Sequence, residues 1–550
     1  MKILLFIVSF SAFSPLLIAQ VPNFLWAQTP PLVGTEYGHS VATDGDGNIF
    51  VTGAFEDSVS FGATTLVSQG GYDVFIVKYN PSGSVVWAIS SGGTENDYGF
   101  GVSTDSNGNV FICGDFSSHQ MIMDSLILTN ASQGIFTDIF IGGYDPSGNI
   151  LWATSFGGNG FDYANDIATD SFGNVLLTGA LFGSEITVGS DTLTSNAFGM
   201  FVAKFNQSGY PIWARSAGES SYDEGLGISC DQSGNIFVAG RFTTTITFDS
   251  VTLNNSGNTS YSDLFLVKYD PSGNVIWVRS ADGQTVDLAY DIDIDPDGNA
   301  VMTGSFSSDT LTIDSVILVN SNPGYADIFV AKYDTAGDLL WARSAGGSND
   351  DHGLSTSIDL SGYIYVTGFF ASPTCSFGQT SLTKSNESVF DLYLIKYDTN
   401  GNVTWAKSAG ETGYSKGNSV ATDLLGNIFV TGYFSGTSIT FDSHILSNDT
   451  NSVSMFVAKI GSEHSDFIDS PTANQILYVF PNPTHNYLNF FAEKSFIGSN
   501  YSIYNSSGIV VLLGNISSEN MKIDLEKLKP GVHYLIYQGN IDKPVKFIKY

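Results

Sequence analysis

Short apolar runs separated by polar turns fill most of the chain and predict β-strands. Residues 100–116, FGVSTDSNGNVFICGDF, place two runs rich in Val, Ile, Phe and Thr on either side of an Asp-x-x-Gly-Asn turn. Residues 263–280, DLFLVKYDPSGNVIWVRS, place two further runs around a Pro-Ser-Gly-Asn turn. Glycine tolerates the positive φ that closes such hairpins. Since no helical periodicity interrupts these runs, the pattern predicts an all-β protein built from hairpins.

The same pattern returns at a fixed spacing. Tryptophans recur every 61 to 65 residues, at Trp26, Trp87, Trp152, Trp213, Trp277, Trp341 and Trp405. Gly-Asn turns keep the same spacing, with Tyr363 in place of one Asn, at Gly47, Gly108, Gly173, Gly234, Gly298, Gly362 and Gly426. Each period holds two hairpins, or four strands, so the chain is a structural repeat.

The strands predict how the repeats associate. Runs such as NIFVTG (48–53) and DIFVAKY (327–333) are nearly continuous in apolar residues, which suits sheets covered on both faces. Four-stranded sheets stacked radially form a β-propeller. The last repeat stops at FVAKI (456–460), whereas the chain begins with an isolated Trp strand, NFLWAQ (23–28). We therefore expect residues 23–28 to pair with residues 455–460 and to close a seven-bladed β-propeller over residues 21–461.

One face of this propeller is expected to carry acidic residues. An acid recurs eight residues before the turn aspartate in six repeats, at Glu36, Asp97, Asp162, Asp223, Asp287 and Asp351, and Ser415 replaces it in the seventh. The segments of about 20 residues between the second and third strands lead to the same face. Long variable loops commonly form binding surfaces. We therefore expect any ligand to bind on this face and the tight turns on the opposite face to be structural.

Two interpretations of the six acids stay open. Carboxylates that converge on the mouth of a central channel could hold a cation, with calcium as the cofactor, or a basic or hydroxyl-rich ligand. A bound calcium ion would raise the melting temperature by mass action. Alternatively, each acid caps backbone amides of a loop in its own blade and needs neither a cofactor nor a metal. The periodicity itself favours this second interpretation.

Signatures of catalysis are weak, and no residue is assigned as catalytic. Residues 413–417, GYSKG, match G-x-S-x-G, but that motif requires a strand-to-helix elbow and no helix follows here. The seven histidines lack a metal-ligand spacing. Three residues break the repeat on the acidic face, Glu224, His352 and Lys416, and they form no recognisable catalytic set.

Charge and cysteine usage narrow the partners. The 550-residue chain has a formal net charge of −33 and only 14% charged residues. Residues 471–550 hold seven Lys and five acids, so the negative charge lies in residues 1–470. This balance argues against DNA, RNA or an anionic membrane as a partner. The three cysteines provide no disulfide framework, and we interpret them as small buried apolar residues.

The two termini predict export. Residues 1–20, MKILLFIVSFSAFSPLLIAQ, match a secretory signal peptide, and no other segment could form a transmembrane helix. Residues 462–473 read as a polar linker. Residues 474–550 form a different unit, expected to be a small β-sandwich, with Pro481-Asn482-Pro483 after an apolar strand, a Tyr504-x-x-x-Gly508 hairpin, a Leu528-x-x-Gly531 turn and a basic, apolar end at 546–549.

These C-terminal motifs resemble the type A sorting domain of the type IX secretion system of Bacteroidota. The resemblance implies that the secretion machinery is a partner and that the protein is secreted to the outer-membrane surface or the extracellular space. His533 before Tyr534 departs from the usual pattern of that domain. The repeats resemble the bacterial SBBP β-propeller repeat, as in GNIFVTG at 47–53 and 426–432. That resemblance implies the fold and no activity.

Two classes of function fit these features. The sequence favours a secreted or surface-attached propeller that binds a glycan or protein ligand, or has a structural role, without catalysis. The alternative is a carbohydrate-active enzyme, a glycoside hydrolase or lyase, that uses two of the ring carboxylates as acid and base. The sequence determines neither the ligand nor the oligomeric state.

Overall fold

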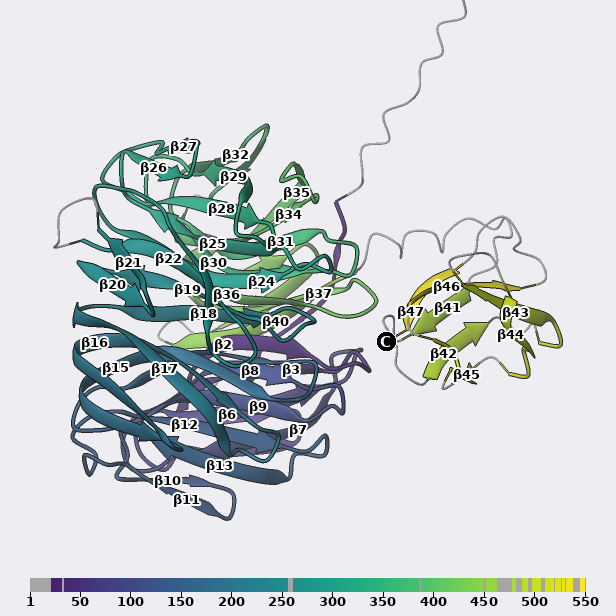
Figure 1. The fold of residues 1–550 in the computed structure, drawn as a ribbon, viewed down its shortest axis with the longest axis horizontal. Coiled ribbons are helices and arrows are strands. Elements are labelled where there is room, and N and C mark those ends of the chain that lie inside the picture. Colours follow the sequence, from purple (N-terminus) through teal and green to yellow (C-terminus); the bar gives the residue numbers. More distant parts are fainter. Residues whose placement is uncertain are drawn as a thin grey trace, which may run out of the picture.

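The computed structural model describes residues 21–31, 34–255, 261–385, 387–448 and 452–461, and within the C-terminal part residues 477–480, 487–492, 497–505, 510–518, 520–525, 527–529, 531–537 and 545–549 (Figure 1). Every regular element of these residues is a β-strand. The predicted signal peptide, the linker 462–473, the Pro481-Asn482-Pro483 motif and Gly508 lie outside the described residues.

Four-strand units make up the repeat region, and we number them 1 to 7 in chain order. In each unit the strands pair antiparallel in sequence order. Unit 1 is β2 (Thr35–Thr43), β3 (Ile49–Glu56), β6 (Asp73–Tyr79) and β7 (Val85–Ser91). Unit 2 is β8 (Asp97–Thr104), β9 (Val110–Phe116), β12 (Asp138–Tyr144) and β13 (Ile150–Phe156). Unit 3 is β14 (Tyr163–Thr169), β15 (Val175–Val188), β16 (Asp191–Phe205) and β17 (Pro211–Ser221).

Units 4 to 7 follow the same order. Unit 4 is β18 (Glu224–Cys230), β19 (Ile236–Phe242), β22 (Asp263–Tyr269) and β23 (Val275–Ser280). Unit 5 is β24 (Asp287–Ile294), β25 (Ala300–Phe306), β28 (Asp327–Tyr333) and β29 (Leu339–Ala345). Unit 6 is β30 (Asp351–Ile358), β31 (Ile364–Phe370), β34 (Glu387–Tyr397) and β35 (Val403–Ala409). Unit 7 is β36 (Thr412–Thr422), β37 (Ile428–Ser435), β40 (Val453–Ile460) and β1 (Phe24–Gln28).

Unit 7 takes its fourth strand from the other end of the chain. β1 pairs antiparallel with β40, and Phe24 lies opposite Ile460 while Gln28 lies opposite Val457. This is the pairing expected from the incomplete first and last repeats. Units 6 and 7 also share one eight-stranded sheet, because the start of β34 pairs in parallel with β36.

The tight turns between first and second strands are built by aspartate. In unit 1 the Asp44 carboxylate accepts hydrogen bonds from the backbone N–H groups of Asp46 and Asn48 and from the Asn48 side chain, at 2.7–3.0 Å. Gly47 adopts a φ of +76° in this turn. The seven turn aspartates accept the same two backbone hydrogen bonds at Asp44, Asp105, Asp170, Asp231, Asp295, Asp359 and Asp423. The Asp-x-x-Gly motif is therefore an Asx turn in every repeat.

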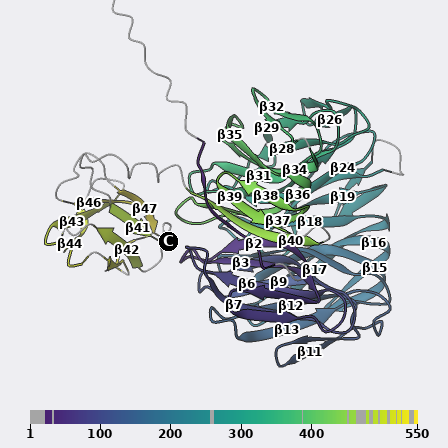
Figure 2. The ribbon, with the colours of Figure 1, turned by 180° about the vertical axis from the view of Figure 1, so that it is seen from behind.

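The segments between second and third strands are hairpins in most units, which differs from the variable loops expected from the sequence. These hairpins are β4–β5 (Ser58–Phe61, Thr64–Val67), β10–β11 (Gln120–Met123, Leu126–Thr129), β20–β21 (Thr245–Phe248, Val251–Asn254), β26–β27 (Thr310–Ile313, Val316–Val319), β32–β33 (Thr374–Phe377, Thr380–Thr383) and β38–β39 (Ser438–Phe441, His444–Ser447). In unit 3 the corresponding residues extend β15 and β16. The hairpins lie against the fourth strands at the periphery, as β10–β11 and β26–β27 show in Figures 1 and 2. Their alternating residues, such as Val59 and Phe61, are buried in the core.

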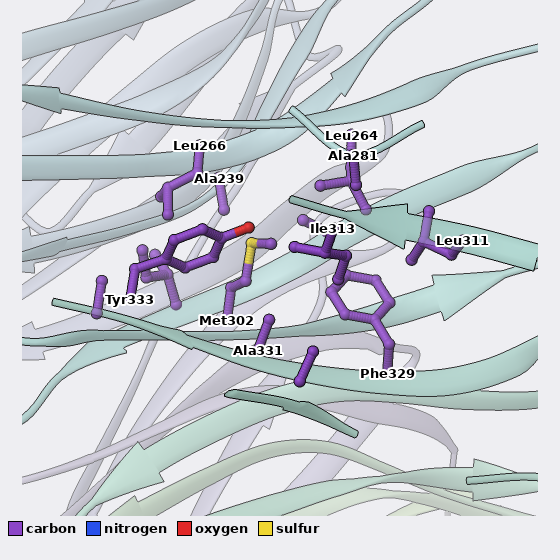
Figure 3. Close-up of a cluster of buried hydrophobic side chains, with 14 of the residues drawn as sticks. Ala239, Leu264, Leu266, Ala281, Met302, Leu311, Ile313, Phe329, Ala331 and Tyr333 are labelled. Atoms are coloured by element: carbon purple, nitrogen blue, oxygen red, sulfur yellow. The ribbon is translucent and has the colours of Figure 1, made fainter. Parts of the chain in front are cut away.

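Apolar side chains of neighbouring units interlock between the sheets. Figure 3 shows one such cluster, in which Leu266 of β22 and Met302 of β25 lie close to Tyr333 of β28. All three side chains are at most 1% exposed. Units 4 and 5 therefore share one core, which explains why the strands carry apolar residues on both faces. Cys113 and Cys375 are buried as free thiols in other clusters of this kind.

Six of the seven tryptophans join their own unit to the outer turn of the next unit. The Trp213 indole Nε1 donates to the Pro271 carbonyl at 3.1 Å. The turn glycine Gly273, at a φ of +84°, lies so close that an added Cβ would stand 2.9 Å from Trp213 Cδ2. The same close approach recurs in six pairs: Trp26–Gly83, Trp87–Gly148, Trp152–Gly209, Trp213–Gly273, Trp277–Gly337 and Trp341–Gly401.

The first strands of successive units contact one another, and β2 contacts both β8 and β36. Polar side chains connect these strands across the unit boundaries. The Thr104 hydroxyl donates to the Thr43 carbonyl at 2.8 Å, and the Thr43 hydroxyl donates to the Thr422 carbonyl at 2.9 Å. The Asn418 amide donates to the Gly38 carbonyl at 2.8 Å. Strands of unit 1 and unit 7, almost 380 residues apart, are thus hydrogen-bonded through side chains.

The C-terminal part contains two further antiparallel sheets. One holds β41 (Leu477–Phe480), β42 (Tyr487–Ala492) and β45 (Asn520–Asp524), and the other holds β44 (Val510–Asn515), β43 (Asn500–Asn505), β46 (Gly531–Tyr537) and β47 (Val545–Lys549). Leu488 and Ile523 from the first sheet share one buried cluster with Ile503 and Leu535 from the second. Two sheets packed on a common core form the arrangement expected of a small β-sandwich.

Replacing Gly273 by alanine tests the contact between tryptophan and turn. The new Cβ would collide with the Trp213 ring, and the alanine would have to keep the positive φ that is unfavourable for a residue with a side chain. We expect the free energy of unfolding to fall by about 2–4 kcal/mol, since both effects destabilise. Thermal and denaturant unfolding would measure the change. Gly378→Ala is the matched control, because Gly378 has a φ of +62° and nothing within 4 Å of its added Cβ. Equal losses in both variants would contradict the role of the contact.

Candidate functional site

The six acids singled out by the sequence lie at the beginning of the first strands and are buried. Asp97, Asp162, Asp223, Asp287 and Asp351 are fully buried, and Glu36 is 2% exposed. Asp97, Asp287 and Asp351 each accept hydrogen bonds from one serine of their own unit, through its backbone N–H and its hydroxyl. Asp162 accepts from the N–H groups of Gly158 and Phe182, and Asp223 accepts from that of Thr243.

These contacts tie the end of the second strand to the start of the first within each unit. Burial raises the pKa of Asp97 to about 6 and that of Asp162, Asp223, Asp287 and Asp351 to about 7, while the hydrogen bonds act in the opposite direction. Among the described residues, no three His, Cys, Asp or Glu side chains lie close enough together to hold a metal ion. The hydrogen bonds favour the capping interpretation, and calcium or ligand binding by the six acids stays a prediction.

A second row of buried aspartates was not found from the sequence. These residues begin the third strands or lie at equivalent positions, and they are Asp73, Asp138, Asp263, Asp327 and Asp391. Asp73 accepts a hydrogen bond from the Gln69 N–H at 2.9 Å, and Asp391 accepts one from the Ser385 N–H at 2.7 Å. The recurring Asp before an apolar run, as in DVFIV and DLYLI, was the available signal. These aspartates also cap loops, so buried acids alone do not mark a ligand site.

The residues one and three positions after each acid point elsewhere, because side chains alternate along a strand. The residue three positions after the acid, or after Ser415 in unit 7, borders an open cavity of about 620 Å³ in every unit. The residue one position after it borders the cavity in units 1, 2 and 7. Its lining residues are Tyr37, His39, Tyr72, Tyr98, Phe100, Asn165, Leu226, Tyr290, Leu354, Lys416, Asn418 and Tyr433. Such a volume and an aromatic lining with a few polar groups are typical of small-molecule sites. None of these lining residues is a carboxylate, so the six acids are not part of this wall.

Aromatic rings form a continuous wall on one side of the cavity. The Tyr37 ring lies 4.9 Å from that of Tyr433 and 6.0 Å from that of Tyr72, measured between centroids. Tyr72 stacks on Tyr98 at 5.6 Å, and Tyr98 stacks on Phe100 at 6.0 Å. Rings that hold one another in this way keep fixed orientations and present flat apolar faces.

Two histidines near this wall are uncharged at neutral pH. His39 stacks on Phe100 at 5.2 Å, and its Nδ1 lies 2.8 Å from the Gly99 carbonyl, which requires a hydrogen on Nδ1. His352 stacks on Phe369 at 4.8 Å. Burial lowers the pKa of both histidines to about 4. His39 Nε2 is therefore an acceptor for a hydroxyl group.

The three residues that break the repeat do not act as one set. Glu224 forms an ion pair with Arg241 at 2.9 Å, and this arginine lies over the Tyr222 ring. Lys416 lines the cavity, and its Nζ lies 5.6 Å from the centroid of Phe369 and 6.0 Å from that of Tyr433. His352 and Lys416 therefore flank the same ring of Phe369, whereas Glu224 belongs to another contact network.

A second aromatic group, also missed from the sequence, lies in unit 3. Phe161 stacks on Tyr163, Tyr163 on Phe198, and Phe198 on Tyr222, with centroid distances of 4.9–6.4 Å. Phe161 and Tyr222 are 40% and 54% exposed. No periodic signal predicts this group, because it depends on loops of different composition meeting at one unit.

Two segments of the chain match known sequence families. Residues 478–549 match the family of secretion system C-terminal sorting domains, and residues 404–433 match the β-propeller repeat family. The chain carries a type IX secretion sorting domain. This domain directs export to the cell surface or the extracellular space, and the repeat match agrees with the β-propeller architecture of the described units. The described residues include no helix long and apolar enough to span a membrane.

The relatives are larger proteins. The chain is 26% identical over 509 residues to the uncharacterized WD repeat-containing protein L264 of Acanthamoeba polyphaga mimivirus, a match that covers 76% of this chain and 36% of the relative. It is 27% identical over 170 residues to the regulatory protein FlaEY of Caulobacter vibrioides, which covers 30% of this chain and 18% of that protein. The chain thus spans well under two thirds of either relative.

Solved structures with similarity to the chain include PorZ, a surface component of the type IX secretion system of Porphyromonas gingivalis. The match to PorZ has 11% identity and a TM-score of 0.18, and it covers 95% of this chain and 100% of PorZ. A gluconolactonase of Xanthomonas campestris has 10% identity and a TM-score of 0.27, covering 80% of this chain and 99% of that protein. Both TM-scores are below the level that indicates a common fold.

The buried acids make stability depend on pH in a defined direction. Because the pKa of Asp287 is raised from 3.8 to about 7 in the folded state, folding favours the protonated form. Its contribution is therefore fully present below pH 4 and is lost as the pH rises through 7. We expect Asp287→Asn, which mimics the protonated acid, to reduce the fall in the free energy of unfolding between pH 4 and pH 8 by roughly 1–4 kcal/mol.

Asp270→Asn is the control for this measurement. Asp270 lies in an exposed turn, and hydrogen bonds from the side chain and backbone of Asn274 lower its pKa. Its contribution is present at neutral pH and is lost as the pH falls, so the control variant should change the pH profile in the opposite direction. Parallel profiles of wild type and Asp287→Asn in chemical denaturation would show that Asp287 is not protonated in the folded protein.

Proposed function

We propose that the protein is an exported seven-bladed β-propeller that binds a glycan in its central cavity. The observation that carries this proposal is the cavity of about 620 Å³ with its wall of aromatic rings, neutral histidine and asparagine. The secreted or surface location of the protein follows from its sorting domain. A concave cavity of this volume suits a compact ligand.

Contacts at both ends of the repeat region support seven blades and a closed ring. The first strands of the units contact one another in succession, and β2 of unit 1 contacts β36 of unit 7. Three hydrogen bonds link these two strands, from Thr43 to Thr422, from Asn418 to Gly38 and from Val41 to Ser419. β1 supplies the strand that unit 7 lacks. Each unit is then a blade over residues 21–461, and residues 474–550 form the sorting domain.

Deleting residues 21–30 tests closure of the ring. The deletion removes β1 and leaves the β40 edge unpaired, and exposed strand edges associate with other chains. We expect the melting temperature to fall by at least about 5 °C and the protein to aggregate, as measured by thermal unfolding and size-exclusion chromatography. Deleting residues 21–23, which precede β1, should change neither. A monomeric 21–30 deletion with the wild-type melting temperature would contradict closure by β1.

The chemistry of the cavity supports a sugar as the ligand. A pyranose ring presents a face of C–H groups, and burying this face against an aromatic ring removes apolar surface from water. Tyr37, Tyr98 and Phe100 offer such rings. The amides of Asn165 and Asn418 line the cavity, but each already donates to the backbone of the neighbouring unit, so their remaining polar atoms and His39 Nε2 are the groups that can meet sugar hydroxyls.

The alternative of a glycoside hydrolase receives less support from this cavity. That mechanism uses two carboxyl groups about 5–9 Å apart on either side of the scissile bond. The residues that line the cavity include no Asp or Glu. The acids considered for this role are buried under loops of their own units. Screening the protein with chromogenic glycosides in the binding experiment below would detect hydrolysis if other residues provide it.

Glycan binding can be tested on a glycan array, followed by titration calorimetry with the best ligand. We expect Tyr37→Ala and Phe100→Ala to weaken binding at least tenfold, which is about 1.4 kcal/mol for each ring. Tyr210→Ala is the matched control, because Tyr210 is 70% exposed in the outer turn of unit 3. The Tyr210→Ala variant should bind the glycan with the affinity of the wild type. A wild-type protein that binds no glycan, or variants at the cavity with full affinity, would refute the proposal.

Removing residues 474–550 tests the role of the sorting domain in export. The signal peptide predicted at residues 1–20 directs the chain across the inner membrane only. The type IX machinery then recognises the C-terminal domain and carries the protein across the outer membrane. We expect the truncated protein to remain folded in the periplasm, as shown by fractionation and protease resistance, while the full chain reaches the surface or medium. Efficient appearance of the truncated protein outside the cell would contradict this role.

A further inference from the structure

Lys416 differs from the lysines that recur in the repeats. Those lysines lie near the ends of third strands, and four of them pair with turn aspartates: Lys78 with Asp44 at 3.7 Å, Lys204 with Asp170 at 2.9 Å, Lys268 with Asp231 at 3.6 Å and Lys332 with Asp295 at 2.7 Å. Lys416 makes no ion pair with any residue that the structure describes. Its Nζ lies over the rings of Phe369 and Tyr433.

The residue before Lys416 also departs from the repeat. In six units the residue before the corresponding position is one of the buried acids, for example Asp351 before His352. In unit 7 that position is Ser415, which is buried and uncharged. Unit 7 therefore places a cation on the cavity wall, and the residue before it carries no acid. Among the residues that line the cavity, Lys416 is the one with a charged side chain, which points to a site for negative charge.

The other groups around Lys416 do not neutralise it. His39 and His352 are uncharged at physiological pH, since burial lowers the pKa of each to about 4, and so they add no charge near Lys416. Lys416 itself is half-buried, and this burial lowers the pKa of its ammonium group. Glu56 and Asp350, which act on Tyr37 and His352, are exposed, and Asp97 and Asp115, which act on Tyr98, are buried; none of these four acids lines the cavity. A partly desolvated ammonium group gains most from a direct anionic partner.

We propose that the cavity selects a glycan with a single acidic sugar, whose carboxylate or sulfate binds the Lys416 ammonium group while its ring stacks on the aromatic wall beside Tyr433 and Tyr37. This inference rests on the proposed glycan-binding function. One lysine matches one anionic group. The formal charge of −33 on the chain repels polyanions over a longer range, so a polymer with an acid on every sugar is disfavoured.

The test compares ligands that differ only in charge. Titration calorimetry would use a glucuronate-terminated oligosaccharide, its glucose-terminated counterpart and a sulfated counterpart, each with the full mature chain. We expect an acidic ligand to bind at least tenfold more tightly than the neutral one. Comparing the carboxylate with the sulfate identifies which anion the site takes.

Variants of Lys416 assign this preference to the lysine. Lys416→Met should lower the affinity for the acidic ligand to about that of the same variant for the neutral ligand and so remove the preference, whereas Lys416→Arg should keep the preference. Lys384→Met is the control, because Lys384 lies outside the cavity lining and donates to the Ser388 carbonyl. The comparison of ligands on the wild type needs no variant, so it decides the question even if Lys416→Met fails to fold.

The possible failures are distinguishable. Equal binding of acidic and neutral ligands by the wild type, or a preference that survives in Lys416→Met, would overturn the role of Lys416 and leave the glycan-binding function in place. Absence of binding to every glycan on the array would refute the glycan-binding function and, with it, this inference.

Discussion

The contact between a tryptophan and the outer turn of the next unit, made by six of the seven tryptophans, holds the repeat region together. The indole ring lies against a glycine of positive φ, and in five units its Nε1 donates to a carbonyl of that turn at 2.9–3.2 Å. Arg279 and Arg343 reinforce this contact, since each lies over its tryptophan and donates to the carbonyl of the same glycine. Only glycine permits both this backbone conformation and this approach. The contact therefore sets the spacing between neighbouring units.

The remaining layers of the structure depend on that spacing. Units held at a constant distance can share apolar clusters between their sheets, as units 4 and 5 do (Figure 3). The same spacing brings the first strands within hydrogen-bonding reach of one another, so that threonine and asparagine side chains link strands of different units. Burial of the aspartates at the starts of the first strands is tolerated in this setting because their carboxylates accept hydrogen bonds from nearby amides or hydroxyls. These residues belong to the scaffold and leave the cavity wall free to vary.

The residues of the cavity wall differ from unit to unit, whereas the residues that hold the fold repeat. Positions that hold the fold, such as the turn aspartates and the tryptophans, are the same in nearly every unit. Positions that face the cavity hold tyrosine, phenylalanine, histidine, asparagine, leucine or lysine, depending on the unit. A symmetric frame carries an asymmetric lining, and an asymmetric ligand requires such a lining. Lys416 beside Ser415 is the clearest case, because the change creates local positive charge in an acidic protein.

The sequence by itself determined the all-β repeat, the Asx turns, the pairing of residues 24–28 with β40 and the C-terminal sorting domain. These features depend on local chemistry: turn residues, alternating apolar runs and motifs read along one segment. The sequence also located the acids of the first strands, but it did not decide where their carboxylates point. Asp97 binds Ser118 of its own unit, whereas Tyr98, the next residue, faces the cavity. Only the tertiary structure made that distinction, because a strand turns adjacent residues to opposite sides. Only it brought Lys416 over the ring of Phe369 and the ring of Tyr37 against that of Tyr433, because these contacts join strands that are distant in the chain.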